Sequence, residues 1–259
     1  MKRYTFPVWL SAVYVLCNAA PAVDLPLEEQ GGFFEGDMNL TPSQIRDIFV
    51  NRNAGLLNTN YRWTPDSMGF VPVPFLIRPA TPYAQAQHST IRLAMNEIER
   101  NTCLRFIPRT NQRDYIEIFS GSGCWSRVGR NGGPQELSLA HSASGTCVTN
   151  GIVIHELIHA LGFYHMQSSP NRDNFVRINY ENIENGMEHN FLRYDSNAVG
   201  LFSTTYDIES IMHYSRSAFS RNGRDTITTF NPNHQNRIGQ RIRMSQGDIT
   251  RIRNMYNCR

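Results

Sequence analysis

Three histidines and a glutamate lie close together in the sequence between His155 and His165. His155 and His159 are four residues apart, so a helix would place both imidazoles on one face, where they can bind a single metal ion. Glu156 lies beside the first histidine and would face the same space. Gly162 can adopt a positive φ and end the helix, so that His165 returns as a third nitrogen ligand. Three neutral imidazoles with an open position favour catalytic zinc, because structural zinc is usually enclosed by four protein ligands.

The alternative is an apolar core helix that contains histidines by coincidence. The extended spacing H-E-x-x-H-x-x-G-x-x-H is more specific than H-E-x-x-H alone. Burial of three imidazoles without partners would also cost free energy. The spacing therefore favours a metal site.

A second motif lies downstream, at Ser210-Ile-Met-His-Tyr214. By itself it says little, because a methionine in an apolar turn usually belongs to the core. Together the two motifs form the metzincin signature, in which the zinc-binding sequence is followed by a Met-turn. The sequence closely resembles the astacin family of zinc endopeptidases. Further matching segments spread the resemblance over residues 53–259: Gly123-Cys-Trp-Ser126, Arg172-Asp173, Val176-Arg-Ile-Asn179, Ser245-Gln-Gly-Asp248 and Tyr256-Asn-Cys258.

The resemblance implies a fold and several residue roles. The fold class would be α+β, a zincin-like catalytic domain with a twisted mixed sheet and helices above a substrate cleft and a more irregular half below. Tyr214 would be a further zinc ligand that can swing away to stabilise the transition state, and Met212 would form the apolar base beneath the metal. The spacing of the four cysteines outside the N-terminal segment allows three pairings. The resemblance implies Cys103 with Cys258 and Cys124 with Cys147.

The implied reaction is hydrolysis of internal peptide bonds in extracellular proteins. A zinc-bound water would give its proton to Glu156, which later returns it to the departing amine. We expect an extended substrate to pair with an edge strand around Gln135–Ala140 by strand addition. The alternative function is a secreted zinc-containing binding protein that is catalytically weak or inactive, and the presence of Glu156 argues against it. A structural zinc site is disfavoured because no fourth Cys or His is evident.

The first fifty residues differ in composition from the rest. A basic start, an apolar stretch from Phe6 to Leu16 and a run of small residues are typical of a secretory signal peptide, predicted over residues 1–22. A membrane anchor or buried first helix is disfavoured because the stretch is short and contains Pro7. The sequence therefore predicts a secreted, extracellular protein.

Residues 23–52 are expected to form an inhibitory pro-segment. They contain Phe34-Glu-Gly-Asp37, which matches the family's pro-segment motif. The resemblance implies that Asp37 takes the open zinc position in the zymogen only, and a carboxylate oxygen is a competent zinc ligand. The other reading is an acidic loop. Activation would require another protease, with trypsin-like specificity as a hypothesis, to cleave near Arg52-Asn53. A net charge of −4 on residues 23–52 and +5 on residues 53–259 favours docking before cleavage.

Met166 departs from the family pattern. Astacin-like enzymes usually have Glu directly after the third histidine, where it receives the new N-terminus through water. Met166 cannot anchor an ammonium group in this way. We therefore expect the mature N-terminus to be looser, or to be held by another acid.

The pattern of apolar residues predicts one folded domain over residues 53–259, with no linker or repeat. Strands are expected at Val71–Arg78, Leu104–Pro108, Tyr115–Phe119 and Gln135–Ala140. Helices are expected at Tyr83–Asn101, Thr149–Leu161 and Ser245–Tyr256, with a short helical pattern at Gln44–Val50.

Composition excludes several classes of protein. The chain has 259 residues, 40% hydrophobic and 18% charged, enough to form a folded core. A net charge of +3 with scattered basic residues does not indicate a nucleic-acid partner. No apolar run reaches the length of a membrane span. We expect a monomer whose partners are protein or peptide substrates and an activating protease.

Overall fold

The computed structural model describes residues 27–48, 58–143, 145–196 and 200–259. The predicted signal peptide and the predicted cleavage site at Arg52-Asn53 lie outside these residues. The strands are β1 Val71–Ile77, β2 Leu104–Pro108, β3 Tyr115–Phe119, β4 Cys124–Ser126, β5 Pro134–Leu139, β6 His141–Ser142, β7 Gly145–Thr146, β8 Val176–Ile178 and β9 Ile227–Thr229. The α-helices are α1 Pro42–Arg46, α2 Gln85–Asn101, α3 Asn150–Ala160 and α4 Gln246–Tyr256. The short 3-10 helices are η1 Leu27–Gln30, η3 Thr59–Tyr61, η4 Met166–Ser168, η5 Arg172–Asn174, η6 Tyr180–Asn182, η7 Glu188–Phe191 and η8 Pro232–His234.

A five-stranded sheet forms one half of the molecule, in the order β2-β1-β3-β5-β4. The first four strands in this order are parallel and β4 is antiparallel to β5. Strand β1 is internal although it contains Pro72 and Pro74. Those prolines lie before Phe75, where pairing with β3 begins, so the missing N–H groups remove no bond from that ladder.

The sheet order corrects the expected substrate strand. Strand β5 lies between β3 and β4, and both of its edges are hydrogen-bonded. The edge next to the metal site is β4, a strand of only three residues. The expectation that an edge strand lies around Gln135–Ala140 is therefore wrong.

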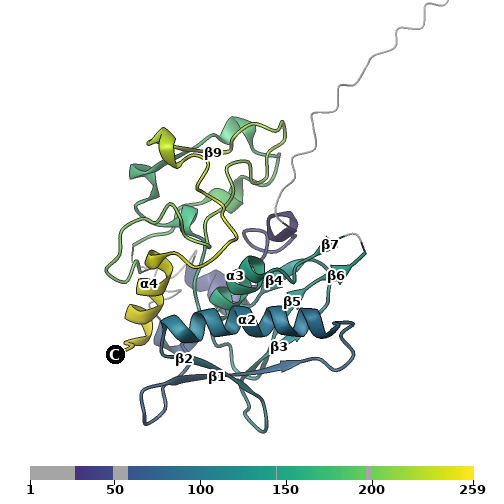
Figure 1. Ribbon diagram of the computed structural model, residues 1–259. Coiled ribbons are helices and arrows are strands. Elements are labelled where there is room, and N and C mark those ends of the chain that lie inside the picture. The colour runs from purple at the N-terminus through teal and green to yellow at the C-terminus, as the bar shows by residue number, and fades with distance from the viewer. Residues whose placement is uncertain (1–26, 49–57, 144, 197–199) are drawn as a thin grey trace, which may run out of the picture.

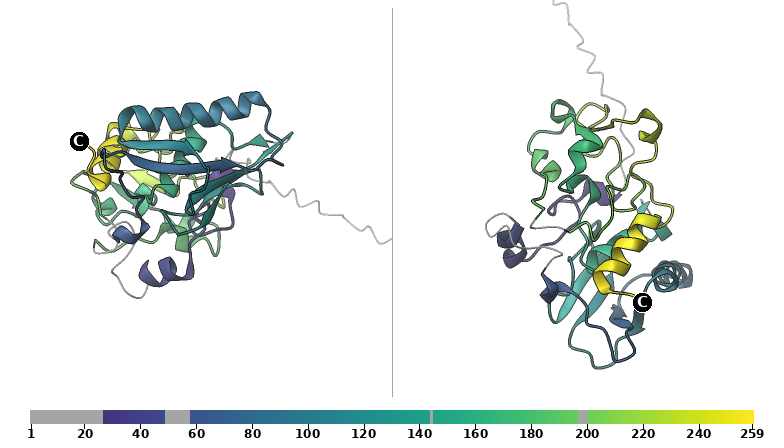
Figure 2. Two further views of the ribbon diagram at one scale, coloured as in Figure 1. Left: turned by 90° about the horizontal axis from the view of Figure 1, so that it is seen from below. Right: turned by 90° about the vertical axis from the view of Figure 1, so that its left-hand side faces the viewer.

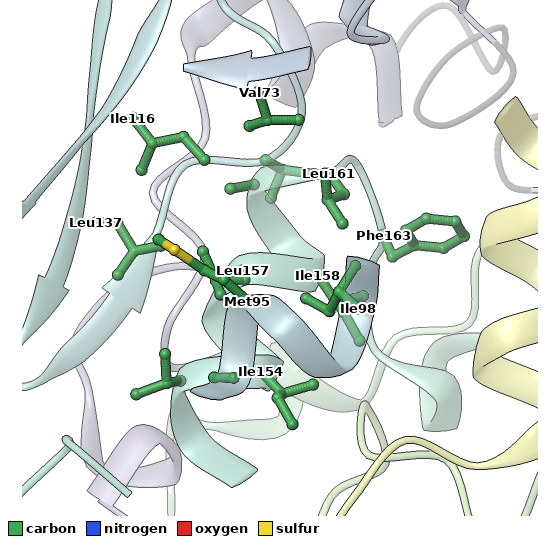
Figure 3. Close-up of a cluster of buried hydrophobic side chains, with 14 of the residues drawn as sticks. Val73, Met95, Ile98, Ile116, Leu137, Ile154, Leu157, Ile158, Leu161 and Phe163 are labelled. Atoms are coloured by element: carbon green, nitrogen blue, oxygen red, sulfur yellow. The ribbon is translucent and has the colours of Figure 1, made fainter. Parts of the chain in front are cut away.

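Helices α2 and α3 pack on one face of the sheet (Figures 1 and 2). The apolar stripe of α2, made of Ile91, Ala94, Met95 and Ile98, is completely buried, as its helical spacing predicts. Helix α3 is buried along its whole length. Figure 3 shows Met95 and Ile98 of α2 among Ile154, Leu157 and Ile158 of α3, with the sheet residues Ile116 and Leu137 to their left. This core fixes the position of α3 against the sheet.

The C-terminal half is more irregular. It consists mainly of turns and short 3-10 helices around the two-stranded sheet β8-β9, and it has its own small apolar core. Helix α4 returns the chain to the first half, where Cys258 forms a disulfide with Cys103; a second disulfide joins Cys124 to Cys147. These are the pairs that the resemblance implied. The architecture is the expected α+β arrangement of a sheet half and an irregular half.

Residues 27–48 lie between the two halves, next to α3 (purple in Figure 1). Among the described residues, no helix is long and apolar enough to cross a membrane.

Candidate metal centre and active site

Helix α3 positions the first two histidines, as the sequence predicts. At Gly151 the helix passes so close to the Arg241 backbone that a Cβ atom would lie 1.8 Å from its carbonyl oxygen, so only glycine fits. After the helix ends at Ala160, Gly162 takes a φ of +105° and turns the chain. This turn brings His165 back to His155 and His159.

Four buried side chains point their ligand atoms at one another: those of Asp37, His155, His159 and His165. The Nε2 atom of His155 lies 3.1 Å from His159 Nε2 and 3.3 Å from His165 Nε2. The Asp37 carboxylate lies 3.0 Å from the His155 Nε2 atom, 3.4 Å from that of His159 and 3.3 Å from that of His165. Four ligand atoms placed tetrahedrally around zinc at its usual bond lengths would lie about 3.3 Å apart. The spacing therefore fits one tetrahedral zinc ion.

The other ring nitrogens support the same interpretation. The Nδ1 atom of His155 lies 2.8 Å from the carbonyl oxygen of Ile211, and that of His159 lies 2.7 Å from the carbonyl oxygen of Phe163. A carbonyl oxygen can only accept, so each Nδ1 carries the hydrogen. In a neutral imidazole the Nε2 atom then presents a lone pair. Lone pairs that converge in a buried space require a cation between them.

The carboxylate and imidazole groups of the cluster also shift the pKa values of one another. Burial alone would raise the pKa of Asp37, but the charges of His165 and His159 hold it well below its usual value. Burial alone would lower the pKa of His165, yet the Asp37 and Glu35 carboxylates raise it to about 9. Both shifts arise from the close contact of carboxylate and imidazole groups in a space shielded from solvent.

Glu156 is completely buried beside this cluster, and neither of its carboxylate oxygens has a hydrogen-bond partner among the described residues. Burial, with the nearby charge of Asp37, raises its pKa well above the usual value. A buried carboxylate without partners is costly and calls for an explanation. Proton transfer to and from a water molecule is a role that needs a group with these properties.

Helix α4 fixes the Met-turn through hydrogen bonds to Asp248. Asp248 accepts hydrogen bonds from Ser210 Oγ at 2.6 Å and from Ile211 N at 2.9 Å. The Ile211 carbonyl in turn orients His155, so α4 is linked to the metal ligands. Met212 is completely buried. The hydroxyl group of Tyr214 donates to the Glu35 carbonyl oxygen at 2.6 Å, so here it contacts residues 27–48.

Residues 27–48 contact both halves of the molecule through backbone and side-chain interactions. Ser126 of β4 donates its N–H to the Asp37 carbonyl and accepts from Asn39 N, both at 2.9 Å, so that Met38 pairs with this edge strand. Arg241 forms an ion pair with Glu28. Glu29 accepts hydrogen bonds from the backbone N–H and the hydroxyl group of Ser215. Glu28 and Glu29 are each 1% exposed, so this contact is fully desolvated.

Glu35 makes a further buried contact that the sequence did not predict. Its carboxylate accepts from Ser168 Oγ and Tyr194 Oη, each at 2.7 Å, and lies 2.9 Å from His165 Nδ1. Four residues of the site were thus missed by sequence reasoning: Glu28, Glu29, Glu35 and Arg241. The motif around Asp37 was the one available signal, since it contains Glu35.

Met166 is completely buried, and its sulfur accepts from Ser169 Oγ at 3.3 Å. The guanidinium of Arg251 lies 3.8 Å from the same sulfur and pairs with Asp248. The position after the third histidine therefore presents an apolar side chain beside an internal ion pair.

Comparison with known proteins identifies the class. A profile of the astacin family, peptidase family M12A, matches residues 58–257. High choriolytic enzyme 1 of Oryzias latipes is 46% identical over 212 residues, which are 81% of this chain and 75% of that protein. The zinc metalloproteinase nas-13 of Caenorhabditis elegans is 40% identical over 87% of this chain and 50% of its own length. Meprin A subunit beta of Homo sapiens is 36% identical over 87% of this chain and 30% of its length.

The fold agrees with this relationship. The solved structure of high choriolytic enzyme 1, a hatching enzyme zinc-protease, matches with a TM-score of 0.72 and 45% identity, over 78% of this chain and 97% of that one. The chain therefore belongs to the astacin family of zinc metalloendopeptidases. Its cofactor is one zinc ion.

Proposed function

We propose that this protein is the zymogen of a secreted zinc endopeptidase that cleaves internal peptide bonds of extracellular proteins. The single observation that carries the proposal is the buried convergence of three imidazole nitrogens with Asp37, beside the unpartnered Glu156. His155, His159 and His165 would hold the zinc ion. When bound, zinc would supply a Lewis acid that polarises a peptide carbonyl and acidifies a water molecule.

Glu156 is the general base and acid of this proposal. Its free carboxylate can accept a proton from the attacking water and then return it to the departing amine. Tyr214 loses its partner when residues 27–48 leave, because its hydroxyl donates to a carbonyl of that segment. The freed hydroxyl can then bind the metal or donate to the oxyanion of the transition state. Met212 forms the apolar floor.

In the zymogen, Asp37 takes the position that water needs. Its carboxylate contacts all three histidines and is 1% exposed. The strand contact at Met38 covers β4 at the same time. Residues 23–52 are therefore proposed to block both the chemistry and the substrate strand. Cleavage near Arg52-Asn53 by an activating protease would release them.

The substrate is proposed to replace this segment along β4. The backbone N–H and C=O of Ser126 are both engaged by residues 27–48, so their release leaves a donor and an acceptor for an extended peptide. Arg241 would lose both carboxylates that now surround it. Its remaining hydrogen bonds go to the carbonyl oxygens of His213 and Gln240, which do not balance the charge of the buried guanidinium. We therefore propose that substrates with an acidic side chain at this position are preferred.

Met166 bears on maturation. Because no carboxylate follows the third histidine, we propose that exact trimming of the N-terminus matters less here. The test is a mature protein with one additional residue before Asn53, which should keep most of its kcat/KM. A loss as large as that caused by removing Glu156 would refute this idea.

The function is tested with three samples: the full chain, protein cleaved before Asn53, and cleaved protein with Glu156→Ala. We expect one zinc ion per chain in each, and hydrolysis of casein or gelatin only by the second, abolished by a chelator. Equal hydrolysis by the cleaved protein and its Glu156→Ala variant would refute the assignment. Zinc binding without hydrolysis in every sample would favour the inactive binding protein.

A further inference from the structure

The three histidines differ in the group that accepts the hydrogen bond from the ring nitrogen Nδ1. The Nδ1 atoms of His155 and His159 contact the backbone carbonyl oxygens of Ile211 and Phe163. Both carbonyls lie outside residues 27–48. The Nδ1 atom of His165 instead lies 2.9 Å from the carboxylate of Glu35, within residues 27–48. One zinc ligand of three therefore depends on a removable segment for its orientation.

The Glu35 contact is specific. Its carboxylate is completely buried, and it has a hydroxyl donor from Ser168, a phenol donor from Tyr194 and the imidazole of His165. Three donors satisfy a buried carboxylate, which would otherwise be costly to desolvate. The site is built for an anion at this point.

The backbone at Glu35 indicates that the side chain is needed. Its φ is +48°, in the left-handed region where glycine is normally favoured, and Gly36 follows with +86°. A non-glycine residue in that region has an unfavourable backbone conformation. A glycine would relieve this cost but would supply no carboxylate for His165. The hydrogen bonds of the side chain offset the backbone cost.

We propose that Glu35 is a positioning residue for the zinc site of the zymogen. By accepting the Nδ1–H of His165 it fixes the tautomer and the ring orientation in which Nε2 faces the metal, and its charge increases the basicity of that ligand. The pro-segment thus strengthens zinc binding through the third histidine, in addition to the block by Asp37. This inference rests on the proposed role of His165 as a zinc ligand.

The experiment measures zinc affinity of the full chain by competition with a chromogenic zinc chelator. The variants are Glu35→Gln, which keeps the shape but removes the charge, and Glu35→Ala. The matched control is Glu29→Gln, the same substitution at a buried glutamate of the same segment that lies near Ser215 and Arg241 and contacts no histidine. We expect the Kd for zinc to rise about 10-fold in Glu35→Gln and up to about 100-fold in Glu35→Ala, with Glu29→Gln within about threefold of the parent.

A second readout separates positioning from loss of docking. In the Co²⁺-loaded full chain, the visible absorption bands report the ligand field at the metal. They should shift in Glu35→Gln and stay unchanged in Glu29→Gln. Equal weakening of zinc binding in both variants, or unchanged binding in Glu35→Gln, would overturn the proposal. Failure of the parent chain to bind one zinc ion would instead refute the proposed function.

Discussion

Replacement of Asp37 by alanine should remove the chemical part of the block and leave most of the docking contacts. The side chain is 1% exposed, and its two oxygens lie 3.0–3.4 Å from three imidazole nitrogens. Removal of one member of a buried charged pair costs about 3–5 kcal/mol. Since about 1.4 kcal/mol corresponds to a tenfold change, the affinity should fall by about 10²- to 10⁴-fold.

The assay adds a synthetic peptide of residues 27–48 to the mature enzyme and measures inhibition of a fluorogenic peptide substrate. Asp37→Asn should inhibit with intermediate strength, because an amide oxygen remains without the charge. The control is Ile45→Ala, because this side chain is 44% exposed and should leave the inhibition constant unchanged. An Asp37→Ala peptide that inhibits within about threefold of the parent would refute the reasoning, since the block would then arise from the other contacts alone.

The uncleaved full chain with Asp37→Ala should show less proteolytic activity than the peptide assay suggests. A segment that is covalently attached acts at an effective concentration of about millimolar, so even a weakened segment stays mostly docked. The same loss of affinity therefore has a smaller effect on the attached segment than on the free peptide, because the effective concentration of the attached segment is higher. Full activity of the uncleaved variant would mean that residues 27–48 contribute little without Asp37.

Three further predictions concern catalysis, pH and stability. In Glu156→Gln the kcat/KM should fall by about 10²- to 10⁴-fold while metal analysis still finds zinc, and a variant with more than about a tenth of the activity would contradict the base assignment. Burial raises the pKa of Glu29 from 4.5 to about 7. Docking therefore takes up a proton, so inhibition by the peptide of residues 27–48 should weaken by up to about tenfold per unit as the pH rises from about 5 to 7. Inhibition by a Glu29→Gln peptide should lack this pH dependence. An equal pH dependence for both peptides would disprove the role of Glu29. Replacing Cys103 and Cys258 by alanine opens a loop with a sequence separation of 155 and should lower the free energy of unfolding by about 5 kcal/mol. Replacing Cys124 and Cys147, which have a sequence separation of 23, should lower the free energy of unfolding by about 3 kcal/mol. A larger loss for this pair than for Cys103 and Cys258, measured by urea unfolding, would contradict the estimate.

The sequence predicted the elements whose patterns are local. Helix α2 was expected at Tyr83–Asn101 and spans Gln85–Asn101, and α3 was expected at Thr149–Leu161 and spans Asn150–Ala160. Each has a buried face or a motif with helical spacing, which is sufficient to define it. The class of the site followed from the spacing of the histidines for the same reason.

The edge strand could not be predicted in this way. A strand of three residues, Cys124–Ser126, is too short to show an alternating pattern. Its position at the edge depends on how the chain returns antiparallel to β5, which is a property of the whole sheet. Strand β5 is twice as long, at six residues, and its alternating Leu137 and Leu139 made it the more conspicuous candidate.

Contacts between residues far apart in the sequence also could not be predicted from local sequence patterns. Glu28 and Arg241 are 213 positions apart, and Glu35 and His165 are 130 apart. In the sequence, Glu28 and Glu29 only contribute to an acidic stretch. The net charges of the two parts predicted attraction between them, but not the particular basic or polar groups involved.

The buried acids of residues 27–48 explain how one segment can contact both halves of the molecule. Asp37 contacts the histidines of α3, and Glu35 contacts Ser168 in the irregular half. Glu28 contacts Arg241 in the loop before α4. Glu28 and Glu35 accept hydrogen bonds from Arg241, Ser168 and Tyr194. Asp37 instead takes a ligand position beside the histidines. Release of residues 27–48 would remove these carboxylates together with that of Glu29, including the two beside Arg241, and this supports the proposed preference for acidic substrate segments.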